Sequence, residues 1–359
     1  MNFNYSFPAI RGFQAKKEFF TLICPLDILS KVFNFYNNEI PEEFRAQRVL
    51  NEKRIPEIAS YMLNNLDSYV FSSITASVDG NYSFSPVSPD QPDIGTLDIA
   101  MTSNLLINDG QHRKAAIDEA IKENPDLKNE SISVVLYVDQ GLERSQQMFS
   151  DLNRHAVKVS KSNSILYNHR DEEIIFMKAY LETNKKLYKY LDKTYDSIAQ
   201  KSNKLFTLSN FYKALQTSYG NKNITSDENL QKFVISYWNY LTISFKEWTF
   251  VLDDEISPYH ARQSSVAVYG IILEALGKLC YYLYLENIKN WEYYVKSLNK
   301  INWQKTNLND WSNRCLLENG SMHKSNAFID RSYYKIKQLI DLPLTSSEKI
   351  KEEKLQKEV

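Results

Sequence analysis

Hydrophobic positions in the N-terminal part of the chain fall in short runs typical of β-strands. Apolar, aromatic and β-branched residues gather in stretches that are separated by polar or turn-forming residues. The strands predicted in this way are 3–10, 18–24, 69–78, 97–99, 105–107 and 132–138. Apolar residues at helical spacing predict helices at 26–33, 54–65 and from residue 111 onward. Between 83 and 93 prolines recur at every third position, which predicts a loop that acts as a lid.

The spacing becomes helical after residue 171 and stays so. A long helix is predicted to begin near Ile174, and another over 264–276, with Gly277 near its end. Residues 346–359 have mixed charge and predict a frayed helix or a disordered tail. The predicted fold is an α/β N-terminal domain with a mixed sheet, followed by a mainly α-helical domain. The predicted boundaries are 1–165, 166–345 and 346–359.

Composition adds constraints on the class of protein. A chain of 359 residues is long enough for roughly two domains, and 43% hydrophobic content is ordinary for a globular protein. The net charge of −1 does not indicate nucleic-acid binding, so DNA binding would require basic residues to gather locally.

The first residues of the chain, its apolar runs and its cysteines predict a cytoplasmic protein. The opening residues lack the pattern of a signal peptide, and no apolar run approaches the ~20 residues that span a bilayer. Cys24, Cys280 and Cys315 are widely spaced with no CxxC, unlike a disulfide framework or a zinc site. Cys24 lies in an apolar run and is interpreted as a buried thiol of a strand. We therefore expect a cytoplasmic protein without a membrane segment or metal site.

The stretch with the clearest chemistry is Asp109-Gly110-Gln111-His112-Arg113. It follows a strand-like triplet and precedes apolar residues at helical spacing, so it predicts a tight turn between a strand and a helix. Gly110 can adopt the positive φ that such a turn needs, and Asp109 can cap the first free N–H groups of the helix.

Two interpretations of this turn stay open. The positive end of the helix dipole, with Arg113 and Lys114 beside it, is a natural place for an anion such as phosphate. Alternatively, Asp-Gly turns into helices are common, and an arginine in a first turn is often only solvated. His112 adds to the first interpretation, because a neutral imidazole can donate to a phosphate or move a proton.

Basic residues also gather just before the predicted helix 54–65. Arg45, Arg48, Lys53 and Arg54 form either a second phosphate site or a solvated loop that is paired with nearby glutamates.

The most one-sided stretch of charge is 152–170, which contains no acidic residue. Its basic residues suit a DNA backbone or a nucleotide, and the hydroxyls of Ser160, Ser162 and Ser164 can add contacts. A solvated basic face is the alternative. The basic side chains are Arg154, Lys158, Lys161 and Arg170, with His155 and His169 between them.

The five residues from Asp109 to Arg113 match the signature of the DGQHR-domain family letter for letter. Within that family the chain resembles the DndB group of the Dnd DNA phosphorothioation systems. The likeness is strongest from Phe7 to about Arg170. The resemblance implies DNA binding and a role in regulating or assisting a sulfur-for-oxygen modification of the DNA backbone. Five further stretches carry it: Phe7–Gly12, Arg45–Arg48, Arg54–Ala59, Ile74–Ser77 and Asp151–His155.

The DGQHR region is also similar to the ParB/sulfiredoxin-like fold, in which a Gly-x-x-Arg turn at a helix start holds nucleotide phosphate. This similarity implies that Gly110 and Arg113 bind phosphate in this chain. The predicted DNA- or nucleotide-binding residues are Gln47, Arg48, Arg54, Asp109, Gly110, Gln111, His112, Arg113, Asn153, Arg154 and Lys158.

Three functions fit these observations. The first is a DNA-binding regulator or accessory protein of a phosphorothioation system, with DNA, the other proteins of the system and further copies of itself as partners; Arg113→Ala should then weaken binding without unfolding the protein. The second is a nucleotide-dependent enzyme that uses ATP with Mg²⁺, with Asp109 and His112 as catalytic residues. It would be an unfamiliar one, because Walker A, GxGxxG and HExxH motifs are absent from the sequence. The third is a protein-binding scaffold.

Overall fold

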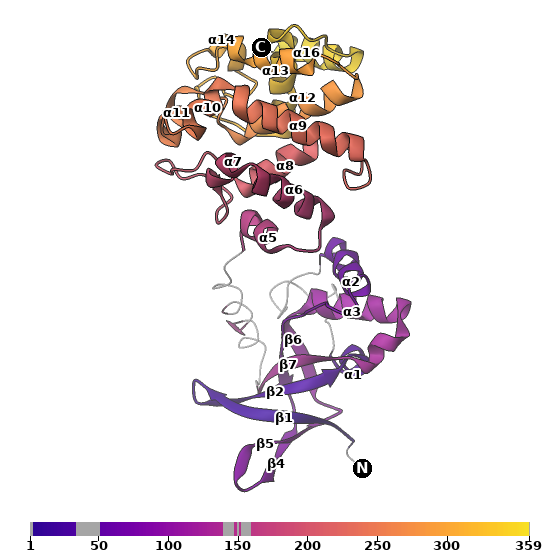
Figure 1. Ribbon diagram of the computed structural model, residues 1–359. Coiled ribbons are helices and arrows are strands. Elements are labelled where there is room, and N and C mark those ends of the chain that lie inside the picture. The colour runs from indigo at the N-terminus through magenta and orange to yellow at the C-terminus, as the bar shows by residue number, and fades with distance from the viewer. Residues whose placement is uncertain (1–2, 34–50, 139–146, 149–150, 152–158, 359) are drawn as a thin grey trace. The chain divides into compact units, whose positions relative to one another are not determined.

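The computed structural model describes residues 3–33, 51–138, 147–148, 151 and 159–358. The chain divides into two compact units, Met1–Val157 and Lys158–Val359. The first contains a seven-stranded mixed sheet with helices, and the second is mainly helical (Figure 1). The predicted fold class is therefore confirmed. In the described part of the chain no helix is both long and apolar enough to cross a bilayer.

The first unit alternates strands and short helices. Its 3₁₀ turns are η2 (Glu52–Arg54) and η3 (Pro125–Asn129). Its helices are α1 (Leu26–Val32), α2 (Ile55–Leu63) and α3 (Gln111–Glu123). Its strands are β1 (Asn4–Gln14), β2 (Lys17–Pro25), β3 (Ile74–Asp79), β4 (Tyr82–Ser88), β5 (Gln91–Ala100), β6 (Asn104–Asp109) and β7 (Ser131–Val138).

The strands lie in the order β4-β5-β1-β2-β7-β3-β6, and only the β3–β7 pair is parallel among the pairs described. Side chains alternate between the two faces of the sheet. On β2, for example, Phe20, Leu22 and Cys24 are fully buried and join one core with α1, α2 and α3, whereas Ile23 is 53% exposed. The helices thus cover one face of the sheet.

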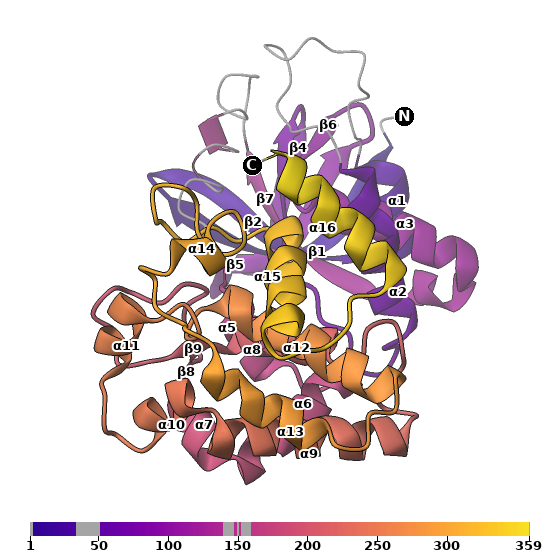
Figure 2. The same ribbon diagram turned by 90° about the horizontal axis from the view of Figure 1, so that it is seen from above.

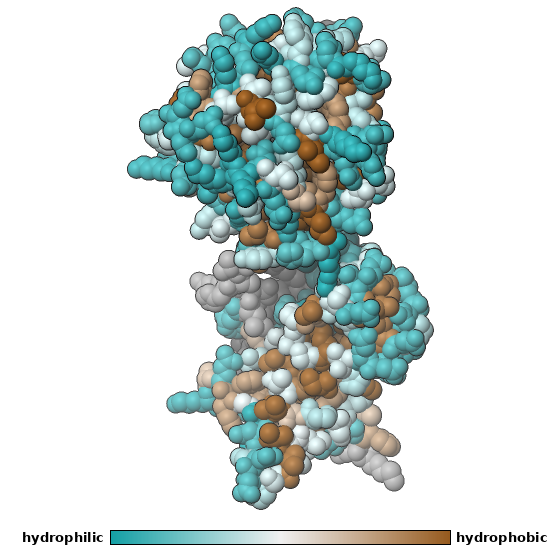
Figure 3. All heavy atoms as spheres, in the orientation of Figure 1, coloured by the Kyte–Doolittle hydropathy of each residue, from teal (hydrophilic) through white to brown (hydrophobic). Residues whose placement is uncertain are grey.

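The opposite face keeps part of its apolar surface exposed. Ile10 and Ile94 lie opposite one another on β1 and β5, and both are about half exposed. In the space-filling view apolar side chains gather over the strands of this unit, while the same view of the helical unit is mainly hydrophilic (Figure 3).

The predicted loop and lid at 83–93 is wrong. These residues belong to the antiparallel hairpin of β4 and β5. Proline suppresses central strands because it lacks an N–H group, but β4 lies at the edge of the sheet, where Pro86 has no second neighbour to bond. Pro92 precedes Ile94, the first β5 residue paired with β1.

The strand predicted at 69–78 begins later than expected, at Ile74. Tyr69 and Phe71 pack against one another as aromatic rings instead of joining the sheet. The carbonyl groups of Ser72 and Ser73 accept hydrogen bonds from a side chain, Arg113, which competes with strand pairing.

The second unit is built from helices around a large core. The two short strands are β8 (Leu191–Asp192) and β9 (Phe206–Thr207), and η4 (Leu298–Lys300) is a 3₁₀ turn. The helices are α5 (Lys161–Tyr167), α6 (Glu172–Thr183), α7 (Lys185–Lys189), α8 (Leu208–Thr217), α9 (Glu228–Ser244), α10 (Lys246–Leu252), α11 (Pro258–Ser264), α12 (Gly270–Leu285), α13 (Trp291–Ser297), α14 (Leu308–Trp311), α15 (Asn326–Leu339) and α16 (Ser346–Glu358).

The helix predicted at 264–276 is displaced in the structure. α11 ends at Ser264, and α12 begins at Gly270 and continues through Gly277. Gly277 is central in α12 because the helix crosses α8 closely there. A Cβ atom at Gly277 would lie 2.2 Å from the carbonyl oxygen of Ala214 and 2.1 Å from Oγ1 of Thr217.

Of the two alternatives predicted for the tail, a frayed helix or disorder, the structure shows a helix and contradicts disorder. Residues 346–358 form α16, which lies beside α15 in the helical unit (Figure 2). Glu352 of this helix is buried. The sequence misled because α16 has few apolar residues, and the described contacts of its side chains with Arg314 and Lys337 are made by glutamates.

The close crossing of α8 and α12 gives a test of the helical core. Replacing Gly277 by alanine should raise helix propensity by about 1 kcal/mol. The clash with Ala214 and Thr217 should instead cost about 1–3 kcal/mol, as in other overpacked cores. We therefore expect a lower melting temperature for Gly277→Ala in a thermal unfolding experiment. An unchanged or higher melting temperature would show that the two helices can separate freely.

Candidate functional site

The DGQHR turn joins the end of β6 to the start of α3, as predicted. β6 ends at Asp109, α3 begins at Gln111, and Gly110 between them has φ of 107°. Gly110 is also tightly enclosed, because a Cβ atom there would lie 3.0 Å from Cγ1 of Ile74 and 3.2 Å from Nη2 of Arg113. Both its conformation and its surroundings therefore require glycine.

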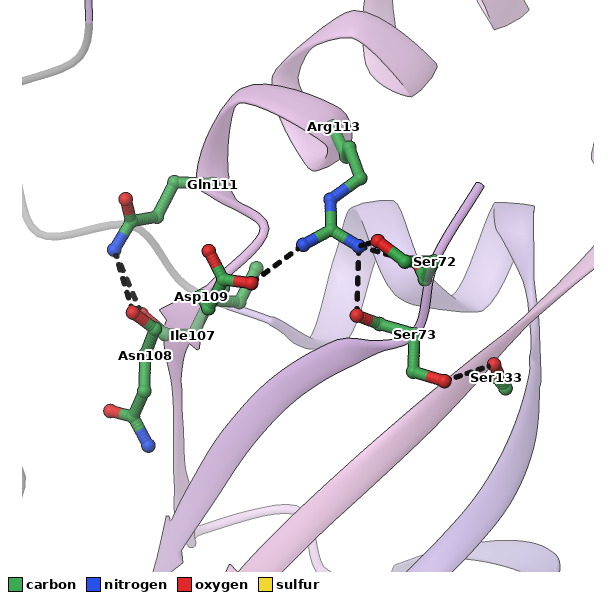
Figure 4. Close-up of polar contacts among 8 residues, drawn as sticks. All are labelled: Ser72, Ser73, Ile107, Asn108, Asp109, Gln111, Arg113 and Ser133. Carbon is green, nitrogen blue, oxygen red and sulfur yellow. Dashed lines mark hydrogen bonds and ion pairs between the residues drawn. The ribbon is translucent and has the colours of Figure 1, made fainter. Parts of the chain in front are cut away.

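Arg113 points back across the turn and ties it to the sheet (Figure 4). Its Nη1 donates to the carbonyl oxygens of Ser72 and Ser73, the latter at 2.8 Å, and to Oγ of Ser72 at 2.5 Å. Its Nη2 donates to a carboxylate oxygen of Asp109 at 2.8 Å. The side chain is only 16% exposed. Arg113 thus joins α3, the end of β6 and the segment that leads into β3.

Asp109 does not cap α3, contrary to the sequence-based expectation. The N-cap residue is Gly110, and no side chain accepts a hydrogen bond there. The carboxylate of Asp109 pairs with Arg113 instead, since the guanidinium lies one helical turn away on the same face. Among the described residues, the first N–H groups of α3 therefore have no side-chain cap.

Gln111 is a buried part of the turn. Its side-chain amide donates to the carbonyl oxygens of Ile107 at 3.2 Å and Asn108 at 3.4 Å (Figure 4). It is 6% exposed, and Asn108 is fully buried. Gln111 therefore fixes the path of the chain from β6 into α3.

His112 connects the turn to the start of α2. Its Nε2 accepts a hydrogen bond of 3.0 Å from the backbone N–H of Asn51, which precedes η2. Partial burial lowers the pKa of His112 below its usual value of 6.5, the positive charge of Arg54 lowers it further, and Asp109 opposes both effects. His112 is therefore neutral at pH 7, with Nε2 as the unprotonated nitrogen.

This contact brings two predicted basic regions together. Arg54 ends η2, acts electrostatically on His112 and is exposed to solvent. Lys114 turns to Asp118 in an ion pair of 2.7 Å and is only 15% exposed. Among the described residues, η2 thus presents the exposed basic side chains of Lys53 and Arg54, whereas Arg113 and Lys114 are paired internally.

Other predicted binding residues lie outside the described residues: Gln47, Arg48, Asn153, Arg154 and Lys158. Of the predicted serine contacts, Ser160 and Ser162 are used within the helical unit, whereas Ser164 is exposed. Ser160 caps α5, and the hydroxyl of Ser162 donates to the carbonyl oxygen of Tyr195. Ser162 is fully buried, so it cannot reach a ligand in this conformation.

Sequence reasoning missed Asn51, Ser72 and Ser73 as parts of the site. Asn51 and Ser73 contribute backbone groups, and Ser72 contributes its carbonyl oxygen together with a hydroxyl. Since every residue carries such backbone groups, the residue types of Asn51 and Ser73 could not have indicated the role.

Cys24 is a buried thiol, as predicted. It is fully buried, and burial raises its pKa to about 12, so the reactive thiolate is not populated near neutral pH. Among the described residues, no group of His, Cys, Asp and Glu side chains could hold a metal ion.

The sequence of the chain is also similar to those of known proteins. A family model described as "DndB: DNA-sulfur modification-associated" matches residues 7–343, which include the turn, nearly all of the first unit and the second unit up to residue 343. The chain belongs to the DndB family. Membership connects it with systems that modify DNA with sulfur.

Part of the chain is also similar to a protein of Bacillus subtilis (strain 168) named SPbeta prophage-derived uncharacterized protein YopQ. The two are 26% identical over 162 residues, which are 43% of this chain and 34% of the relative. The chain thus spans about a third of the length of that relative. No solved structure matches the chain, so the ParB/sulfiredoxin-like part of the expected fold stays a prediction.

Because Arg113 makes several hydrogen bonds within the fold, we expect its removal to lower the stability of the protein. Arg113→Ala would leave the carbonyls of Ser72 and Ser73 and the carboxylate of Asp109 without their donor. Hydrogen bonds with a charged partner contribute about 1.5–3 kcal/mol, so we expect a loss of about that size in the free energy of unfolding. Urea titration followed by circular dichroism measures it. Lys122→Ala, at the exposed far end of α3, is the control and should change little.

The lowered pKa of His112 predicts that the stability of the protein depends on pH. Its pKa is lower in the folded than in the unfolded state, so its contribution is full above pH 6.5 and is lost as the pH falls towards the folded-state pKa. Between pH 7 and pH 5 the native chain should lose more stability than His112→Gln, in which the side chain cannot be protonated. Parallel curves of melting temperature against pH for the two proteins would contradict this.

Proposed function

We propose that this DndB-family protein is a DNA-binding regulator or accessory protein of a DNA sulfur-modification system. We place its contact with backbone phosphate at the surface formed by the starts of α2 and α3. Family membership supports the involvement in DNA sulfur modification. The DNA contact is our inference from the chemistry of the site.

The observation that carries the proposal is the hydrogen bond from Asn51 to His112. It holds Arg54 close to the N-terminus of α3, where the first N–H groups have no side-chain cap. An uncapped helix N-terminus and an adjacent exposed arginine together favour an anion, because the helix dipole and the guanidinium attract the same negative charge. Phosphate is the anion that DNA presents.

In this proposal Arg54 contacts the phosphate, and Arg113 acts through the shape of the turn. The guanidinium of Arg113 makes hydrogen bonds to three neighbouring residues, and its side chain is largely buried. A phosphate could recruit it only by replacing those bonds. The predicted contacts of Gln47, Arg48, Asn153, Arg154 and Lys158 remain part of the proposal on the sequence alone, because these residues lie outside the described part of the chain.

The geometry does not favour the enzyme hypothesis. Asp109 is held by Arg113, and the unprotonated nitrogen of His112 already accepts a hydrogen bond from Asn51. His112 would first have to leave Asn51 to take a proton from a substrate through this nitrogen. We therefore do not propose ATP hydrolysis.

The test is the affinity of purified variants for labelled duplex DNA at several salt concentrations. Arg54→Ala should bind about fivefold more weakly at low salt, which corresponds to about 1 kcal/mol for one exposed charge contact. The plot of log affinity against log salt should become less steep by about 0.9, the contribution of one phosphate contact.

Lys122→Ala is the matched control, because it removes one positive charge from the opposite end of α3. If Arg54→Ala and Lys122→Ala bind DNA with the same affinity and salt dependence, Arg54 does not contact phosphate. If the native chain shows no salt-sensitive DNA binding at all, the proposal fails as a whole.

A further inference from the structure

In α16, the buried and partly buried side chains among the described ones, from Ser346 to Lys354, are charged. Within α16, between Ser346 and Lys354, the only fully buried side chain is Glu352, and Glu348 is partly buried. Ile350, the apolar residue between them, is 56% exposed. Attachment of α16 through its carboxylates is therefore electrostatic, unlike the usual burial of an apolar helix face.

Glu348 neutralises a lysine that has no contact with solvent. Its Oε2 lies 2.7 Å from Nζ of Lys337 on α15, and Lys337 is fully buried. Nζ also lies 3.5 Å from the ring centroid of Tyr282, so it is enclosed by an aromatic face and a carboxylate. Burial lowers the pKa of Lys337, while Glu348 counteracts this effect.

Glu352 neutralises a second buried cation. Its two carboxylate oxygens accept hydrogen bonds from Nη1 and Nη2 of Arg314, with 3.1 Å for the Nη1 contact. This is the bidentate fork that guanidinium forms with carboxylate or phosphate. Arg314 is 8% exposed and lies just after α14.

Glu348 and Glu352 are four residues apart, so they lie on one face of α16 about 6 Å apart along its axis. If α16 leaves, Lys337 and Arg314 both lose the carboxylates described above. Unpaired buried cations are costly, so the underlying surface requires either α16 or another ligand with two negative charges. The family match ends at residue 343, before α16 begins. The covering helix thus lies outside the matched part.

We infer that α16 is an internal competitor of nucleic acid: its two glutamates occupy an anion site, formed by Arg314 and Lys337, that takes backbone phosphates when α16 is released. This inference rests on the proposed function, because it adds a second, regulated DNA contact to the first. A guanidinium fork and a lysine ammonium are the two side chains that most often bind phosphate. Bound DNA and docked α16 therefore exclude one another.

The test compares two full-length double variants. Glu348→Gln/Glu352→Gln keeps the shape of α16 but weakens its attachment, so duplex DNA should bind at least about tenfold tighter than to the native chain at low salt. Glu318→Gln/Glu353→Gln removes two charges from exposed positions of the same unit, and its affinity should change less than about twofold.

Equal affinities of the two double variants would overturn the inference. If the native chain binds DNA while Glu348→Gln/Glu352→Gln gains nothing, the proposed function stands and only the inference fails. If neither binds DNA, both fail. If polyglutamate competes with DNA for the released site at equal charge concentration, the site takes acidic peptides, and its assignment to nucleic acid is wrong.

A second test of the inference uses the native chain, so its result does not depend on whether a variant folds. Lys349 and Lys351 are exposed lysines of α16, and trypsin cleaves helical segments only after local unfolding. Adding duplex DNA should speed cleavage at these two lysines if DNA displaces α16. Unchanged or slower cleavage in the presence of bound DNA would overturn the inference.

Discussion

The guanidinium of Arg113 is the contact on which the candidate site depends. It bonds the end of β6, the start of α3 and the segment before β3 to one another. These three parts meet only in the folded unit, so the conformation of the turn is fixed by tertiary structure as well as by Gly110. A planar group with several donors suits this task, because it can satisfy carbonyl and carboxylate oxygens in different directions at once.

The fixed turn explains how a small number of exposed charges can form a binding surface. Arg113 and Gln111 hold the backbone, His112 holds the neighbouring segment through Asn51, and Arg54 is left exposed at the start of α2. A chain with a net charge of −1 can bind DNA only if its basic residues are concentrated in this way. In the second unit, the buried cations Arg314 and Lys337 are likewise gathered at one element, since both bind glutamates of α16.

Patterns of neighbouring residues predicted those features of the fold that depend on contacts between residues close together in the sequence. The strands other than β4, together with α3 and the positive φ of Gly110, follow from side-chain spacing and from the need for a turn. Ser72 and Ser73, two of the partners of Arg113, lie about 40 residues away and accept its hydrogen bonds through two carbonyl oxygens and one hydroxyl, so local spacing did not reveal them. Edge position, which made Pro86 acceptable in a strand, is likewise a property of the whole sheet. The docking of α16 escaped prediction because its cations lie 11 and 38 residues away along the chain.

The central claim is that DNA phosphate binds at the starts of α2 and α3. Hydrogen exchange of the native chain, measured with and without duplex DNA, tests it most directly. The uncapped first amides of α3, at residues 111–113, should exchange rapidly in the free protein, because no carbonyl of the helix can accept their hydrogen bonds. Bound DNA should slow exchange there and at 53–54. Slower exchange elsewhere, with these amides unchanged, would contradict the account.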